Sequence, residues 1–313
     1  MDGITIGIPS YNEEGNITNL LKSIISSNIN GILVKEVIIS DDSTDSTPQL
    51  VEDFIKQNRL QNITVYHHGI RRGTAAAWSE IFNKASGIII ILFDADVIID
   101  RNCISELAGS LAKNELVGLC ATNQIPIDAR GISGKACSFI MEWLRSLRQK
   151  ELSKYTVMGR ALGIRTDVAK TLQIPEEVIA VDLYLQYSVM KMQLNVMYND
   201  KAKVYFKPPT NLLEFSSQVI RARNGHKQVT NLPVELNLEP SWRSLLGSIL
   251  SSVRSKPVCA AAAATSLLSV PYFSRKLEYT NDAKWDTSKS TKSIDYDEFI
   301  SKQNMENNME NNT

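Results

Sequence analysis

Short apolar runs alternate with helical patterns through the first half of the chain. Residues 88–93 form a continuous apolar run, which is typical of a parallel-sheet strand buried on both faces. Residues 16–27 repeat apolar positions at steps of three and one, which predicts an amphipathic helix. The same reasoning predicts strands at 4–8, 36–40, 63–66 and 117–121. It also predicts a helix that begins at residue 47 and helices at 73–85 and 101–113. This alternation predicts an α/β fold with a Rossmann-like, doubly wound and mostly parallel sheet.

The second half is less regular. Its patterns predict helices at 134–152, 182–192 and 211–224 and a strand at 204–206. We therefore expect one folded domain over 1–230, followed by a helical segment over 231–280. Residues 281–313 are rich in Asn, Lys, Ser and Thr and too polar to bury a core, so we expect a disordered tail there.

Composition excludes several classes of protein. The 313 residues carry 34 basic and 34 acidic side chains, so the zero net charge argues against a general nucleic-acid binder. There are four cysteines and no CxxC pair, which makes a disulfide framework or a structural zinc site an unfavourable interpretation. No signal-peptide pattern opens the sequence, and we expect a reduced, cytoplasmic setting.

Polar clusters follow the first four predicted strands. They occupy residues 9–14, 41–45, 67–73 and 94–96. Ligands of open parallel sheets bind beyond the carboxyl ends of the strands, so these clusters should meet in one crevice.

Asp94-Ala95-Asp96 is the most informative of the clusters. Two carboxylates directly after a buried strand offer the hard oxygen ligands that Mg²⁺ and Mn²⁺ favour. Neither a P-loop nor GxGxxG is present, so metal and side chains should hold a phosphate-bearing ligand. The alternative is an ordinary turn with an N-cap for the next helix.

Four motifs together resemble glycosyltransferase family 2. They are IPSYNEE at 8–14, SDDSTDST at 40–47, Arg-Gly with an Ala-rich helix at 72–77, and Asp-Ala-Asp at 94–96. The resemblance implies a GT-A fold and inverting transfer from a nucleotide-diphosphate sugar. It also implies a nucleotide-sugar-binding half over 1–125 and an acceptor-binding half over 126–230.

The resemblance implies donor contacts from all four strand ends. Pro9 and Tyr11 would flank the nucleobase, with Glu13 near the ribose. Asp41 would accept a hydrogen bond from the base, with Asp42 as the alternative. The remaining donor residues implied are Arg71 or Arg72, Asp94 and Ala95. Asp94 and Asp96 would hold the metal, Mn²⁺ or Mg²⁺.

The family's base is an acidic residue that opens a helix, and Asp182 matches that position. It would take the proton from the acceptor hydroxyl, and its alternative is a helix N-cap. Arg221 and Arg223 match the family's Gln-x-x-Arg-x-Arg element and would contact the leaving diphosphate. A solvated helix face is the alternative for these arginines. His226 is either a further metal ligand or a surface histidine.

Residues 242–273 contain no acidic side chain, and an apolar stripe runs from Trp242 to Val253 at helical spacing. Such a stripe with basic flanks suits a helix lying on an anionic leaflet. The alternatives are a pair of helices packed on the domain and a transmembrane span. The first interpretation predicts a cytoplasmic protein peripheral at the inner face of the cell membrane.

Three functions are compatible with these patterns. The leading hypothesis is an inverting, metal-dependent glycosyltransferase that uses a nucleotide-diphosphate sugar and a lipid-linked or surface-glycan acceptor. A polyprenyl-phosphate sugar synthase of the same fold would not need Asp182 as a base. A non-catalytic, membrane-associated nucleotide-sugar-binding protein would keep its activity without Asp94 and Asp182.

Overall fold

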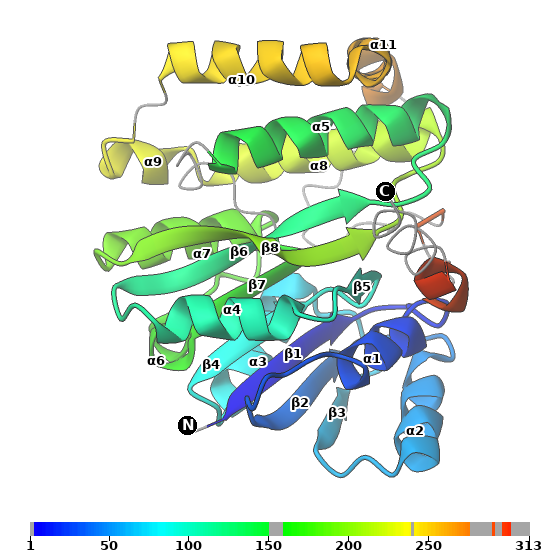
Figure 1. The fold of residues 1–313 in the computed structure, drawn as a ribbon, viewed down its shortest axis with the longest axis vertical. Coiled ribbons are helices and arrows are strands. Elements are labelled where there is room, and N and C mark those ends of the chain that lie inside the picture. The colour runs from blue at the N-terminus through cyan, green and yellow to red at the C-terminus, as the bar shows by residue number, and fades with distance from the viewer. Residues whose placement is uncertain (1–2, 150–158, 239–240, 276–289, 292–295, 302–313) are drawn as a thin grey trace, which may run out of the picture.

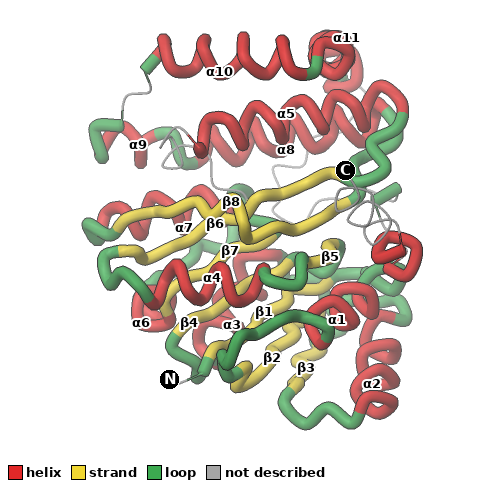
Figure 2. The backbone as a smooth tube through the Cα atoms, in the orientation of Figure 1, coloured by secondary structure: helices red, strands yellow, loops and turns green. Residues whose placement is uncertain are grey.

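The computed structural model describes residues 3–149, 159–238, 241–275, 290–291 and 296–301. One eight-stranded sheet has the order β3-β2-β1-β4-β7-β6-β8-β5. Helices cover both faces of this sheet, and a further helical layer lies beyond one side of it (Figures 1 and 2). The predicted α/β class is confirmed.

The first half of the sheet is parallel, as predicted. It consists of β1 (Ile4–Ser10), β2 (Val34–Asp41), β3 (Ile63–His67) and β4 (Ile89–Phe93). The connecting helices are α1 (Ile17–Ile25), α2 (Thr47–Asn58) and α3 (Thr74–Lys84). Successive residues of β4 enter different cores: Ile91 packs into one cluster and Leu92 into the other. Burial on both faces therefore explains the unbroken apolar run.

The second half of the sheet is mixed, whereas the sheet as a whole has four parallel strand pairs and three antiparallel ones. β7 (Ala161–Arg165) pairs antiparallel with both β4 and β6 (Val117–Pro126). β8 (Asn195–Phe206) runs parallel to β6, and β5 (Val97–Ile99) pairs antiparallel with β8. The prediction found only the last three residues of β8, because the polar residues 199–201 interrupt its apolar pattern and its first half is not buried.

The remaining helices form two groups. α4 (Cys103–Ala112), α6 (Thr166–Thr171) and α7 (Val181–Lys191) lie close to the sheet. The others are α5 (Gly131–Gln149), α8 (Leu212–Gln228), α9 (Asn231–Glu235), α10 (Trp242–Ser255) and α11 (Pro257–Ser274). A small core of Ala136, Phe215 and Ala263 joins α5, α8 and α11, so these helices form a layer of their own (Figure 1).

Part of the predicted disordered tail is ordered. Residues 296–301 are helical, and Tyr296 and Phe299 pack against Ile98 and Tyr205. The rings of Tyr205 and Phe299 are 4.7 Å apart. Two aromatic side chains one helical turn apart suffice to anchor this piece in an otherwise polar segment. The disorder prediction is therefore wrong for these residues. Apart from residues 290–291, the rest of the tail lies outside the described residues.

An ion pair ties α5 to β8 and predicts a pH-dependent stability. Arg145 donates two hydrogen bonds of 2.8 Å to Asp200, and Tyr198 donates a third of 2.7 Å. The bonds from Arg145, above all, lower the pKa of Asp200 to about 2. An unfolded aspartate has a pKa of about 3.9. The contribution is therefore fully present above about pH 4 and is lost as the pH falls toward 2.

We expect Asp200→Asn to lower the free energy of unfolding by about 1 kcal/mol near neutral pH, after solvent screening of this half-exposed pair. The difference from the parent protein should shrink between about pH 4 and pH 2. Urea unfolding across this pH range measures it. Asp167→Asn, which breaks the more exposed pair with Arg165, is the matched control and should cost less. If Asp200→Asn lowered the free energy of unfolding equally at about pH 4 and at about pH 2, the pH dependence could not come from Asp200.

Candidate active site

The ends of the parallel strands bring the predicted polar clusters together. In register, Ser10 of β1 lies beside Asp41 of β2, which lies beside His67 of β3. The Asp42 N–H donates to the Ser10 carbonyl at 3.0 Å, so the pairing continues into the loops. The expected crevice at this sheet edge is therefore built by the backbone itself.

The loop after β1 is held by the loop after β2. Asn12 adopts a left-handed conformation, with φ of 53°, and its side-chain oxygen accepts from the Thr44 N–H at 2.8 Å. Glu13 is buried, and its carboxylate accepts a 3.0 Å hydrogen bond from Asn16. These contacts hold the loop, and the ribose contact that the motif implied for Glu13 stays a prediction.

Two features of this edge suit a nucleobase. The Arg71 guanidinium stacks over the Tyr11 ring, 4.1 Å from its centre. Asp41 is buried and accepts hydrogen bonds from the Ser43 hydroxyl at 2.6 Å and from His67 Nδ1 at 2.7 Å. Pro9, one residue before the end of β1, is half-buried beside Ser40.

Arg72 lies in a polar network beneath the loop. It donates to Asp42 through Nε at 2.9 Å, and to Glu80 and Ser40 through Nη2 at 2.9 Å each. Although burial opposes it, the hydrogen bonds to Asp42 and Glu80 raise the pKa of Arg72. Asp42 also accepts from two backbone N–H groups, those of Arg72 and Gly73. Both side chains thus hold the β3–α3 loop, and Arg71 is the better placed arginine for the donor.

Glu80 is the residue that completes this network, and its neutralisation should destabilise the fold. It accepts from Ser40, Arg72 and His68 at 2.7 to 2.9 Å. We expect Glu80→Gln to lower the free energy of unfolding by about 1–3 kcal/mol, because Arg72 loses half of its compensation. Chemical denaturation measures this. Glu52→Gln, which affects an exposed pair with Lys56, should change little; equal effects of the two would refute the network's importance.

Asp94 and Asp96 follow β4 and face β7. The Asp94 N–H donates to the Arg160 carbonyl at 2.8 Å, and the Arg160 side chain contacts Asp96 at 3.4 Å. Arg160 itself lies over the Phe206 ring, 4.0 Å from its centre. The next helix, α4, begins only at Cys103 with Asn102 in the cap position. The N-cap alternative for Asp94 and Asp96 is therefore wrong.

Asp182 lies in the first turn of α7, where the cap position belongs to Ala180. Its Oδ1 accepts from the Leu183 N–H at 3.0 Å. A Cβ at Gly159 would lie 3.2 Å from the Asp182 Cβ, so glycine permits this close approach. Burial raises the pKa of Asp182, although hydrogen bonds and Arg221 oppose the shift. A carboxylate with a raised pKa is better matched to proton transfer near neutral pH.

The electrostatics show that these side chains form one cluster. Burial, and then the Asp96 carboxylate, raise the pKa of Asp94, while Arg160 and Arg221 oppose the rise. Burial lowers the pKa of Arg221 to about 10, although the carboxylates of Asp182 and Asp94 oppose this shift. Arg221 is nevertheless exposed to solvent. Three carboxylates and two guanidinium groups therefore converge from β4, β7, α7 and α8.

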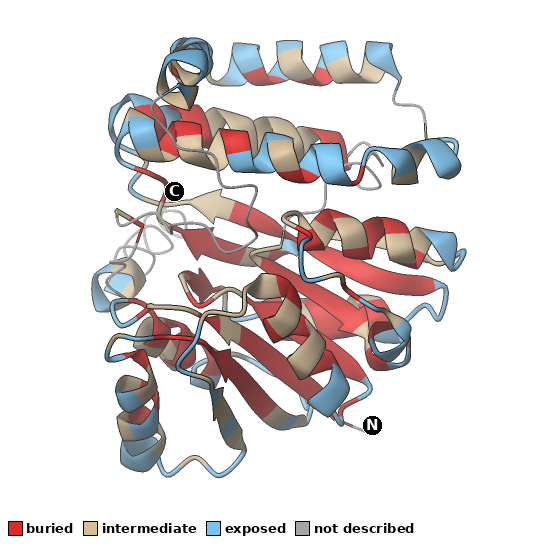
Figure 3. Ribbon diagram, turned by 180° about the vertical axis from the view of Figure 1, so that it is seen from behind, coloured by how far each residue is buried: buried red, intermediate tan, exposed pale blue. Residues whose placement is uncertain are grey.

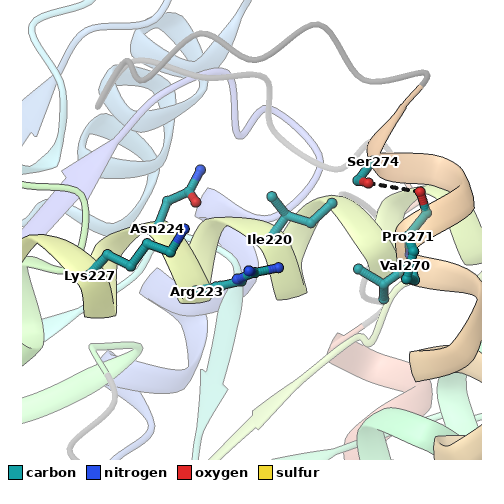
Figure 4. Close-up of a pocket in the computed structure, with 7 residues that line it drawn as sticks. All are labelled: Ile220, Arg223, Asn224, Lys227, Val270, Pro271 and Ser274. Atoms are coloured by element: carbon teal, nitrogen blue, oxygen red, sulfur yellow. Dashed lines mark hydrogen bonds between the residues drawn. The ribbon is translucent and has the colours of Figure 1, made fainter.

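Arg223 does not join this cluster. Residues two positions apart on a helix point about 200° apart around its axis, so Arg223 faces away from Arg221. It lines a separate pocket of about 450 Å³ between α8 and the end of α11 (Figure 4). The other lining residues are Ile220, Asn224, Lys227, Val270, Pro271 and Ser274. The predicted donor contact is thus supported by placement for Arg221 and not for Arg223.

Two further candidates concern metal binding. Among the described residues, no three His, Cys, Asp or Glu side chains group closely enough to hold an ion unaided. His226 is exposed on α8 and lies close enough to lower the pKa of Asp182. The pair of Asp94 and Asp96 remains the candidate ligand set, with oxygens left for a substrate to supply.

The sequence pattern did not single out Arg160 or Glu80 as site residues, and it included His67 only as part of the polar cluster at 67–73. Each becomes informative only through a partner on another element: Asp96, Asp41 and Arg72, respectively. A charged residue beside a glycine in the strand-forming stretch at 159–165 was the available signal for Arg160.

The sheet order and the carboxylates that follow β4 match the GT-A fold that the four motifs implied. The chain belongs to glycosyltransferase family 2: the family's model, "Glycosyl transferase family 2", matches residues 5–172. It is a glycosyltransferase.

Known relatives agree with this assignment. The chain is 22% identical over 233 residues to a poly-beta-1,6-N-acetyl-D-glucosamine synthase of Staphylococcus epidermidis, covering 72% of this chain and 55% of that protein. It thus spans about half the length of the curated relatives it matches. Two solved structures share the fold. One is a mannosyltransferase of Pyrobaculum calidifontis with GDP-Man and Mn²⁺ (TM-score 0.59, 19% identity, 86% of this chain and 75% of that one). The other is S. aureus TarS 1-349 with UDP-GlcNAc (TM-score 0.53, 17% identity, 88% and 93%).

Proposed function

We propose that the protein is an inverting, metal-dependent glycosyltransferase. It moves a sugar from a nucleotide-diphosphate sugar to a hydroxyl of a lipid-linked or surface-glycan acceptor. The observation that carries the proposal is the convergence of Asp94, Asp96, Asp182 and Arg221 at one end of the sheet. That arrangement supplies charge for a diphosphate and a base for a hydroxyl in the same place.

The donor lies across the ends of β1, β2 and β4 in this proposal. Tyr11 and Arg71 provide a stacked surface for the base, and Asp41 lies beside them with its orientation fixed by Ser43 and His67. Asp94 and Asp96 fit a Mn²⁺ or Mg²⁺ ion, because two adjoining carboxylates repel each other and a divalent cation removes that repulsion. When bound, the ion neutralises charge on the diphosphate. Metal use also fits the mannosyltransferase neighbour, which was crystallised with Mn²⁺.

The acceptor enters from the side of α7. Its hydroxyl loses a proton to the Asp182 carboxylate as the oxygen attacks the anomeric carbon. The bond between that carbon and the diphosphate oxygen breaks, and Arg221 lies where it offsets the charge of the departing group. A single displacement of this kind inverts the anomeric configuration.

The lipid-linked or glycan nature of the acceptor rests on relatives. The Staphylococcus epidermidis relative is named as the synthase of a polysaccharide, and this chain matches about half of that protein. We further propose that the protein works in the cytoplasm, peripheral at the inner face of the cell membrane.

A donor screen tests the proposal. The full chain is incubated with UDP-, GDP- and dTDP-sugars in the presence of Mn²⁺ or Mg²⁺, and release of the nucleoside diphosphate is measured. We expect one nucleotide class to be turned over slowly with water as acceptor. Turnover of none of the donors, with none of them bound in calorimetry, would refute the proposal.

A further inference from the structure

Helix α10 buries two small polar side chains against the protein and leaves most of its apolar stripe exposed. Its buried residues are Ser248 and Ser252, and Ser248 accepts a 2.9 Å hydrogen bond from Trp143 of α5. A helix on a soluble protein normally turns its apolar stripe toward the core. Here small serines face α5 instead.

Most of the apolar stripe of α10 is exposed, whereas Leu245 and Ile249, at its edge nearest the buried serines, are half-buried. Trp242 is 76% exposed and Leu250 is 65% exposed, and Leu246 and Val253 continue the same stripe. Figure 1 shows α10 as the outermost element of the molecule, lying across the end of the helical layer. Figure 3 shows the same helix largely exposed from behind. Val258, exposed at the start of α11, adjoins α10 in sequence.

We infer that this surface, made by α10 and the adjoining part of α11, docks onto an anionic phospholipid bilayer. Residues 242–275 contain four basic side chains and no acidic one: Arg243, Arg254, Lys256 and Arg275. Lys256 pairs with Glu142 of α5 at 3.6 Å, so the charge offered to a leaflet comes from the three arginines. An apolar face with basic neighbours and a terminal tryptophan matches an interfacial helix in an anionic leaflet. A second copy of this chain fits less well, because its equally basic face would be repelled.

The geometry favours lying on the bilayer over crossing it. α10 has 14 residues and is about 21 Å long, shorter than the roughly 30 Å hydrocarbon core. Among the described helices, α11 alone is long and apolar enough to span, by length and composition. However, its Ala263 belongs to the core shared with α5 and α8, so α11 is held by the domain. The inference deepens the peripheral location proposed above by naming the surface and the lipid chemistry.

Vesicle flotation of the full chain tests the inference. The probes are vesicles of phosphatidylcholine alone and vesicles with about 30% phosphatidylglycerol. We expect the protein to float with the anionic vesicles. About 0.5 M NaCl should release only part of it, because salt screens the charges while the apolar stripe remains inserted. The double variant Leu246→Ser/Leu250→Ser should lower the partition coefficient at least about tenfold. Both leucines are exposed, so folding should not suffer.

The matched control is Leu33→Ser/Leu116→Ser, which alters two leucines of similar exposure elsewhere on the molecule, and it should bind as the parent does. The inference is overturned if the parent does not float, if both double variants float equally, or if Leu246→Ser/Leu250→Ser merely converts a dimer to a monomer in light scattering. Nucleoside diphosphate release without lipid is measured on the same samples. Intact release without flotation refutes the docking surface and leaves the proposed function standing.

Discussion

Asp182→Asn should lower turnover by about 10²- to 10⁴-fold while leaving donor affinity nearly unchanged. Asparagine keeps the shape of the side chain and can still accept the 3.0 Å hydrogen bond from Leu183, but it cannot take a proton. Turnover is measured as nucleoside diphosphate release at saturating donor, and affinity by calorimetry. Asp167→Asn, which changes a carboxylate in the first turn of α6, is the control and should behave as the parent does.

The pH profile supplies a second readout. Because burial raises the pKa of Asp182, parent turnover should decline on the acid side at a higher pH than an exposed aspartate would give. That decline should be absent from the residual activity of Asp182→Asn. Parallel loss of affinity and turnover would instead assign Asp182 to the fold. Full activity of the variant would mean that the acceptor already carries its own anion, as a polyprenyl phosphate does.

Asp96→Asn should abolish the metal-dependent part of donor binding. In Mn²⁺ the affinity for the nucleoside diphosphate should fall at least about 100-fold, to the level that the parent shows with EDTA, because one of two carboxylate ligands is lost. Calorimetry with and without EDTA measures this. Asp53→Asn, on the exposed face of α2, should bind as the parent does.

The variant also weakens the contact between Asp96 and Arg160, so its fold must be checked separately. A thermal melt without ligand serves this purpose. Binding of equal strength with and without metal in the parent would contradict the role of Asp94 and Asp96. A variant that melts like the parent yet binds donor normally in Mn²⁺ would do the same.

The donor half of the fold follows closely from the sequence. β1 and β4 are buried on both faces, and the helices α1 and α2 carry clear apolar stripes, so hydrophobic periodicity locates these elements. β8 escaped detection because Asn199 and Asp200 interrupt its apolar pattern and face other partners. The apolar stripe of α10 is evident in the sequence, but the sequence does not tell which side of the helix packs on the protein. That side depends on Trp143 of α5, far away in sequence.

The site was predictable where motif and strand end coincide. Asp94, Asp96, Asp182 and Arg221 converge although they lie on separate elements, because strand order and the crossing of α8 bring them together. Arg72 and Arg223 are of the same residue type as Arg71 and Arg221, yet they lie elsewhere. The Arg72 side chain is held by Glu80, and Arg223 lies on a different face of α8 from Arg221. Neither fact is evident from the motif.

The central claim is a single displacement at the anomeric carbon, assisted by Asp182. The most direct test is the configuration of the sugar first released or transferred from the donor that the screen identifies. Proton NMR early in the reaction, before mutarotation, distinguishes the two anomers. The account predicts a product with the anomeric configuration opposite to that of the donor. A product that retains the donor's configuration would contradict it.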